Sequence, residues 1–134
     1  MSMSRRKIRE QIFKLLFQAE FHHRGEMEAQ AELYFAEEEP AIEDGQKEEI
    51  WGKLSKLLAC LDELDEKLGD ALTGWSLKRV GKVELAILRL ALYEILYDEE
   101  VPDSVAINEA VELAKKYGPE DASGFVNGVL AKLV

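Results

Sequence analysis

Cysteine is nearly absent from this chain, and long apolar runs are absent altogether. The one cysteine among 134 residues, Cys60, has no partner for an intrachain disulfide, which suits a reducing compartment. It lies in an apolar helical stretch, where a small buried side chain is expected rather than a nucleophile. No run of 18 apolar residues occurs, and polar residues such as Glu10 and Lys14 interrupt the stretch behind the basic N-terminus. We therefore expect a cytoplasmic protein that makes no membrane contact.

Sequence motifs for catalysis and metal binding are missing as well. The chain contains no Walker loop, no GxGxxG and no HExxH. His22 and His23 are adjacent, so their side chains diverge, and no third ligand is nearby. The acidic runs Glu37–Glu39 and Glu48–Glu49 are typical of a solvated surface rather than of an acid and base pair. We expect neither an enzyme nor a bound metal or cofactor.

Glycine and proline are scarce, and helical periodicity dominates the remainder. Nine glycines and three prolines are too few for a fibrous or linker-like chain, and 47% apolar residues allow a core. Lys82–Tyr97 is apolar on nearly every side, as in the middle helix of a bundle. These patterns predict an all-α fold, a compact single-domain bundle of about six to seven helices over residues 1–134. The expected helices span residues 4–21, 26–36, 45–72, 82–97, about 104–117, and 121 to the C-terminus.

Three residues carry the expected helix ends. Ser4 is placed to cap the first helix, because a serine oxygen accepts a hydrogen bond from a free backbone N–H of the first turn. Ser104 follows Pro102 and is expected to cap the next-to-last helix in the same way. Gly118, followed by a proline, is expected as the glycine just past the end of that helix.

Small and polar residues interrupt the apolar faces of the last two helices. Gly124 and Gly128 are four apart, so they form a smooth strip that would let another helix approach closely. Asn108 and Asn127 stand within apolar faces, and buried amides must be hydrogen-bonded. We expect the two asparagines to fix the register between these helices.

One acidic residue lies within the most apolar helix. Glu94 needs a cationic partner if it is buried, since an unpaired buried charge is costly. Arg79 and Arg89 are the two candidates for that partner.

Charge is distributed unevenly along the chain. The formal net charge is −10, which opposes non-specific coating of duplex DNA. Residues 1–25 nevertheless carry six basic and two acidic side chains, whereas residues 26–74 carry four basic and fifteen acidic ones. An acidic protein with a basic N-terminal end indicates an anionic partner for that end.

The basic cluster Arg5, Arg6, Lys7 and Arg9 is the strongest binding signal in the composition. Arg5 and Arg9 are one helical turn apart with Arg6 beside them, and guanidinium groups grip phosphates in a bidentate way. The alternative is an ordinary basic N-terminus. Four phosphate contacts to a single strand would give a log–log salt slope of about −3 at most, so stacking groups or a partner must supply further affinity.

Several sequence blocks resemble the NusB transcription antitermination family. The blocks are Val83–Glu94, Val105–Lys115 and Phe125–Leu130, together with the Arg5–Glu10 opening. They cover about residues 5–21 and 75–134, while residues 22–74 match only in length and helical character. The resemblance implies a helical factor that binds the single-stranded boxA element of nascent ribosomal RNA together with NusE, a small-subunit ribosomal protein. It also implies a place in the RNA polymerase complex that reads through terminators.

The resemblance also implies roles for individual residues. Arg5, Arg6, Lys7 and Arg9 match the family's arginine-rich RNA-binding segment. Phe17, Asp121 and Phe125 match further positions near the RNA, and Glu84 matches a position that contacts NusE. For Phe125 the alternative is plain core packing, and for Asp121 it is a helix N-cap. Gly124 stands where relatives often have a basic residue.

Two other functions remain open beside RNA binding. One is a homodimeric or adaptor module for protein–protein interaction, with weak RNA affinity of its own. The other is the helical domain of an RNA-modifying methyltransferase, which the absence of a catalytic domain disfavours.

Overall fold

The computed structural model describes residues 3–72 and 76–134, and every regular element in these ranges is helical. The predicted all-α fold is therefore confirmed. No helix in the described ranges is long and apolar enough to cross a membrane. The α-helices are α1 (Arg5–Gln18), α2 (Met27–Glu37), α3 (Asp44–Ala59), α4 (Leu61–Ala71), α5 (Lys82–Tyr97), α6 (Asp103–Tyr117) and α7 (Ala122–Ala131), with short 3₁₀ turns η1 (Ala19–Phe21), η2 (Arg24–Glu26) and η3 (Leu77–Arg79).

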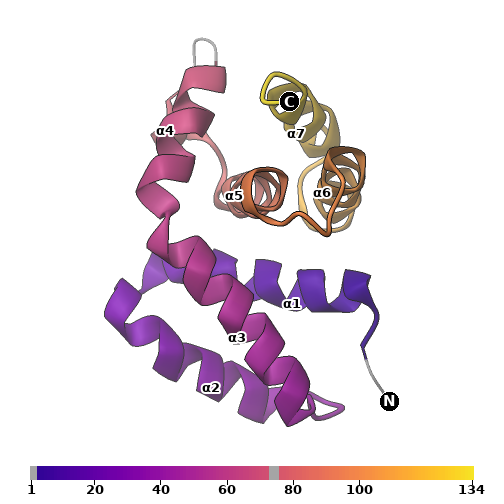
Figure 1. The fold of residues 1–134 in the computed structure, drawn as a ribbon. Coiled ribbons are helices and arrows are strands. Elements are labelled where there is room, and N and C mark those ends of the chain that lie inside the picture. The colour runs from indigo at the N-terminus through magenta and orange to yellow at the C-terminus, as the bar shows by residue number, and fades with distance from the viewer. Residues whose placement is uncertain (1–2, 73–75) are drawn as a thin grey trace. The chain divides into compact units, whose positions relative to one another are not determined.

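The chain forms two compact units, Met1–Ala59 and Cys60–Val134. In the first unit, α3 packs against α1 and α2 (Figure 1). Ile12, Leu16, Ile50 and Leu54 are fully or almost fully buried. Their spacing by threes and fours gives α1 and α3 one apolar stripe each, which accounts for the pairing of the two helices.

In the second unit, α5 packs against α4, α6 and α7, and α6 also packs against α7 (Figure 1). Every residue of α5 from Leu85 to Glu94 is buried. The predicted central helix is thus confirmed with the same bounds. Arg89 of α5 donates two hydrogen bonds to Asp65 of α4, from Nε to Oδ1 and from Nη2 to Oδ2, both 2.8 Å long. This fork-to-fork pair ties α4 to the centre of the unit.

The expected long helix over residues 45–72 is wrong, because the chain breaks it into α3 and α4 at Cys60. Cys60 has φ −114° and ψ 19°, outside the helical range. The apolar stripe continues with unchanged spacing from Leu57 through Leu61 to Leu64, and no proline or glycine marks the break. Burial raises the pKa of the Cys60 thiol, and the negative charge of Glu63 adds to the effect.

The expected ends of α6 also differ from those observed. Ser104 lies inside the first turn, and Pro102 occupies the N-cap position without a side-chain hydrogen bond. Gly118 does follow the helix, but its φ of −94° is not left-handed. Glycine is required there by space, because a Cβ would lie 2.7 Å from the Cβ of Ala122 and 2.9 Å from the carbonyl oxygen of Ala114.

The small and polar residues of α6 and α7 face solvent rather than another helix. Asn108 and Asn127 are exposed, so they do not fix a buried register. Gly124 and Gly128 are exposed too, and a Cβ at either position would meet no atom of the described chain within 4 Å. The expected close helix approach at this strip is therefore wrong.

Candidate nucleic-acid interface

The basic cluster occupies the first turns of α1. Ser4 caps the helix as predicted, with its Oγ accepting a hydrogen bond from the backbone N–H of Lys7 at 3.1 Å. Arg5, Arg6 and Lys7 are exposed, and the first turn contains no acidic residue. The positive end of the helix dipole thus coincides with three cationic side chains, which makes this end of α1 attractive to an anion.

Arg9 differs from the other three cations, because it is only 8% exposed. It lies four residues before buried Phe13 and seven before buried Leu16, so helical geometry places it on the buried stripe of α1. The expected grouping of the Arg9 guanidinium with those of Arg5 and Arg6 is therefore contradicted by the burial of Arg9. The exposed cluster consists of Arg5, Arg6 and Lys7.

Acidic neighbours pair with part of this exposed cluster. Arg5 forms an ion pair with Glu49 of α3, in which the two side chains are 77% and 39% exposed. Lys7 lies 3.4 Å from Glu10, one turn further along α1. The Arg5–Glu49 pair is exposed and contributes little free energy, so it does not prevent Arg5 from exchanging to phosphate oxygens. Glu10 is buried, so its pair with the exposed Lys7 is only partly open to solvent.

Phe17 belongs to an aromatic pair near the other end of α1. Its ring meets that of Phe21 edge to face, with centroids 5.3 Å apart. Phe17 is half-buried, whereas Phe21 is 60% exposed. Phe21 was not predicted as a site residue, although its spacing of four from Phe17 was visible in the sequence.

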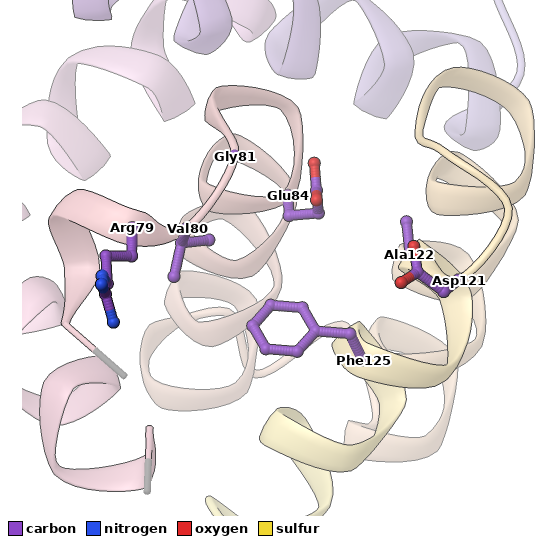
Figure 2. Close-up of a pocket in the computed structure, with 7 residues that line it drawn as sticks. All are labelled: Arg79, Val80, Gly81, Glu84, Asp121, Ala122 and Phe125. Carbon is purple, nitrogen blue, oxygen red and sulfur yellow. The ribbon is translucent and has the colours of Figure 1, made fainter. Parts of the chain in front are cut away.

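In the second unit, one hollow of about 240 Å³ brings together Glu84, Asp121 and Phe125 (Figure 2). Glu84 precedes Asp121 by 37 positions and Phe125 by 41, and only the packing of α7 on α5 brings it to them. The remaining lining comes from Ala122 of α7 and from the segment that leads into α5, namely Arg79, Val80 and Gly81.

Phe125 is not a plain core residue, and the Asp121 side chain does not cap its helix. Phe125 is half-buried, and its ring reaches from α7 toward Val80 rather than into a closed core (Figure 2). Asp121 occupies the N-cap position of α7, yet its side chain makes no capping hydrogen bond. Its exposed carboxylate is thus directed to the hollow and not to the end of its own helix.

Glu84 lies in the first turn of α5, three residues after the N-cap Gly81. Its carboxylate folds back over that glycine, since a Cβ at Gly81 would lie 2.7 and 2.9 Å from the two Glu84 carboxylate oxygens. A negative charge at this end of a helix is favourable. Gly81 therefore provides the space that this orientation of Glu84 needs.

Arg79 is the residue of this hollow that sequence reasoning did not assign to the site. It was considered as a partner of buried Glu94, but it is exposed and lines the hollow instead. Arg89, the other candidate, pairs with Asp65. The sequence did offer one signal for Arg79, because a cation stands two residues before Gly81, the N-cap of α5.

Metal ligands do not gather at either place. In residues 3–72 and 76–134, no three His, Cys, Asp or Glu side chains are arranged to hold a metal ion. The charged and aromatic side chains at the two places can make ionic contacts, stacking contacts and hydrogen bonds.

Comparisons with known proteins identify the family of this chain. The sequence model of the NusB family matches residues 6–134. The transcription antitermination protein NusB of Lachnoclostridium phytofermentans is 49% identical over 132 residues, which cover 98% of this chain and 99% of that protein. A solved structure of T. maritima NusB superposes with a TM-score of 0.86 at 33% identity, covering 99% of this chain and 92% of that one. A structure of antitermination factors NusB and NusE in complex with dsRNA shares the fold, with a TM-score of 0.79 at 24% identity, covering 96% and 94%. This chain belongs to the NusB family.

Proposed function

We propose that this chain is a transcription antitermination factor that binds single-stranded boxA RNA of nascent ribosomal transcripts together with NusE. In that role it helps RNA polymerase read through terminators. The observation that carries the proposal is the exposed Arg5, Arg6 and Lys7 cluster at the capped start of α1. Family membership, with relatives described as transcription antitermination proteins, supports it.

The cluster on α1 supplies the ionic part of the RNA contact. Three exposed cations that each neutralise one phosphate give a log–log salt slope of about −2 on a single strand. Arg9 is buried in the packing of α1, so we do not assign it a phosphate contact. Modest ionic affinity of this size needs stacking contacts in addition.

Aromatic and acidic side chains supply the remaining RNA contacts. Phe125 offers a half-exposed ring, and stacking of an unpaired base on such a ring contributes about 1–3 kcal/mol. Phe17 contributes a second aromatic contact at α1. Asp121 accepts hydrogen bonds from base amino groups, since an ionised carboxylate is an acceptor only.

The acidic middle segment of the chain is suited to NusE, a basic partner. Residues 26–74 carry fifteen acidic and four basic side chains. Complementary charge of this kind raises the rate of encounter and suppresses wrong partners. Glu84, exposed to the hollow at the start of α5, is the contact we assign to NusE.

The RNA assignment is tested by charge reversal. The variant R5E/R6E should abolish binding to a boxA RNA in fluorescence anisotropy, with an unchanged helical circular dichroism spectrum. K115E/K116E at the end of α6 makes the same change in net charge at two exposed lysines and serves as the matched control. Equal RNA affinity of the two variants would overturn the assignment. Arg9 is left unchanged, because a buried charge reversal would disrupt folding.

The NusE assignment is tested by Glu84→Lys in a calorimetric titration. We expect this change to weaken NusE binding more than RNA binding. Glu112→Lys, at an exposed position of α6, is the control. A titration with NusE that matches the control would refute the role of Glu84.

The alternative function is a homodimeric or adaptor module with little RNA affinity. Exposed apolar side chains favour it, since Phe21 is 60% and Leu33 58% exposed in the first unit. A Phe21→Ser/Leu33→Ser variant that converts a dimer to a monomer in sedimentation, in a protein that binds no boxA RNA, would establish this function instead.

A further inference from the structure

We propose that Arg79 binds the backbone phosphate of the same nucleotide whose base stacks on Phe125. This second phosphate site lies in the unit Cys60–Val134 and is additional to the α1 cluster. The inference rests on the proposed RNA-binding function and assigns a residue that neither the sequence motifs nor the family resemblance marked.

Arg79 is exposed, but its backbone is held in place. Its N–H donates to the carbonyl of Ser76 at 3.0 Å, and the following residue, Val80, is only 8% exposed. The guanidinium makes no hydrogen bond or ion pair with another residue of the described ranges. Arg5 and Arg89, by contrast, are paired with Glu49 and Asp65. A phosphate at Arg79 would therefore displace no existing ion pair.

The positive and negative side chains of the hollow lie in different parts of it. Arg79 lies on the Val80 side of the Phe125 ring, whereas Asp121 lies on the opposite side (Figure 2). Glu84 is held over Gly81, away from Arg79 (Figure 2). A phosphate is repelled by the two carboxylates and attracted by the guanidinium, so the RNA backbone must pass on the Arg79 side.

The hollow also has the size and chemistry for a base. Its volume is about 240 Å³, and it is open to solvent beside the Phe125 ring. Phe125 presents a half-exposed ring, and every base has a π-face that stacks on such a ring. With the base on Phe125 and its edge toward Asp121, the phosphate of that nucleotide faces Arg79.

A nucleic acid fits this arrangement better than a protein segment does. The protein partner that meets Glu84 is expected to be basic; such a segment is attracted by Glu84 and Asp121 but offers no anion to Arg79. A single nucleotide instead combines an anion and a stacking ring. Arg79 and Phe125 match these two groups in one hollow.

The test compares Arg79→Gln with Lys78→Gln in fluorescence anisotropy on boxA RNA at several salt concentrations. Lys78 is the adjacent residue in η3, is also exposed and does not line the hollow, so both variants lose one charge at nearly the same place. We expect Arg79→Gln to raise Kd about three- to tenfold and to reduce the magnitude of the salt slope by about 0.7. Lys78→Gln should change Kd less than about twofold with little change of slope.

A double-mutant cycle with Phe125→Ala tests whether one nucleotide makes both contacts. If it does, Arg79→Gln should cost less affinity in the Phe125→Ala background than in the wild type, because the nucleotide is no longer fixed there. Additive losses would overturn the assignment to a single nucleotide.

The remaining outcomes separate this inference from the proposed function. Wild-type protein that binds no boxA RNA would overturn both. RNA binding with equal effects of Arg79→Gln and Lys78→Gln would overturn the Arg79 site and leave the proposed function standing. Unchanged RNA affinity with altered NusE binding in Arg79→Gln would place Arg79 on the protein-binding surface instead.

Discussion

Arg89 and Asp65 join α5 to α4 through two parallel hydrogen bonds of 2.8 Å. Arg89 is 8% exposed, so loss of Asp65 removes two charge-assisted hydrogen bonds from a buried cation. We expect Asp65→Ala to lower the free energy of unfolding by about 2 kcal/mol, less than for a fully buried pair because the Asp65 side chain is 26% exposed. Urea unfolding measures the change.

A second ion pair provides the control for that prediction. Glu112 and Lys115 lie 3.8 Å apart on α6, with both side chains more than half exposed. Glu112→Ala should change the free energy of unfolding by no more than about 0.5 kcal/mol. Equal effects of the two substitutions would show that the Arg89 pair does not hold α4 to α5.

Gly118 is predicted to be irreplaceable for steric reasons. Alanine tolerates its φ of −94°, but the added Cβ would collide with Ala122 and with the carbonyl oxygen of Ala114. We expect Gly118→Ala to destabilise the protein by about 1–3 kcal/mol in urea unfolding. Gly128→Ala, in the open middle of α7, should instead stabilise it by about 0.5–1 kcal/mol. A neutral Gly118→Ala would contradict the close packing of α6 on α7.

Glu49 is predicted to restrain RNA binding through its ion pair with Arg5. Glu49→Gln removes the competing carboxylate, so the Arg5 guanidinium is released for phosphate. We expect affinity for boxA RNA to rise about two- to threefold at low salt, in anisotropy titrations. Glu48→Gln makes the same charge change at the exposed neighbouring position. The idea fails if both variants gain equally, because the gain would then be a general charge effect.

Tyr97 is predicted to ionise at unusually high pH. Its hydroxyl donates a hydrogen bond to Glu63, which raises its pKa from 10.0 to about 12. Because the folded state favours the neutral phenol, this contribution to stability is present below pH 10 and is lost as the pH rises through about 12. In ultraviolet titration, Glu63→Gln should return one tyrosine to ionisation near its ordinary pKa, with Tyr97→Phe identifying the signal. An unchanged titration curve in Glu63→Gln would contradict the hydrogen bond.

Much of the helical fold could be predicted, because burial on one face leaves a periodic trace in the sequence. The bounds of α5 and the Ser4 cap follow directly from apolar spacing and from capping chemistry. The break at Cys60 left no such trace, since the apolar stripe keeps its phase across it. Periodicity reports which face is buried and does not detect a single non-helical residue within a continuous apolar stripe.

The sequence nominated single residues for the candidate site but did not give their arrangement. Charge and a spacing of one helical turn grouped Arg9 with Arg5, although its distance from Phe13 and Leu16 along the helix placed it on the buried stripe. Asn108 and Asn127 were expected within the buried faces of the last two helices, yet both are exposed. Arg79 lies near Phe125 only because α7 packs on α5. No local sequence pattern encodes that packing.

The acid-free first turn of α1 has a thermodynamic consequence. Arg5, Arg6 and Lys7 repel one another and oppose the helix dipole, so this turn is less stable than one with acidic residues in the same positions. A polyanion held there relieves the repulsion, and any ligand that prefers the ordered turn stabilises it by mass action. Amide hydrogen exchange in the first turn should therefore slow when RNA binds, which makes fraying of α1 a direct reporter of occupancy.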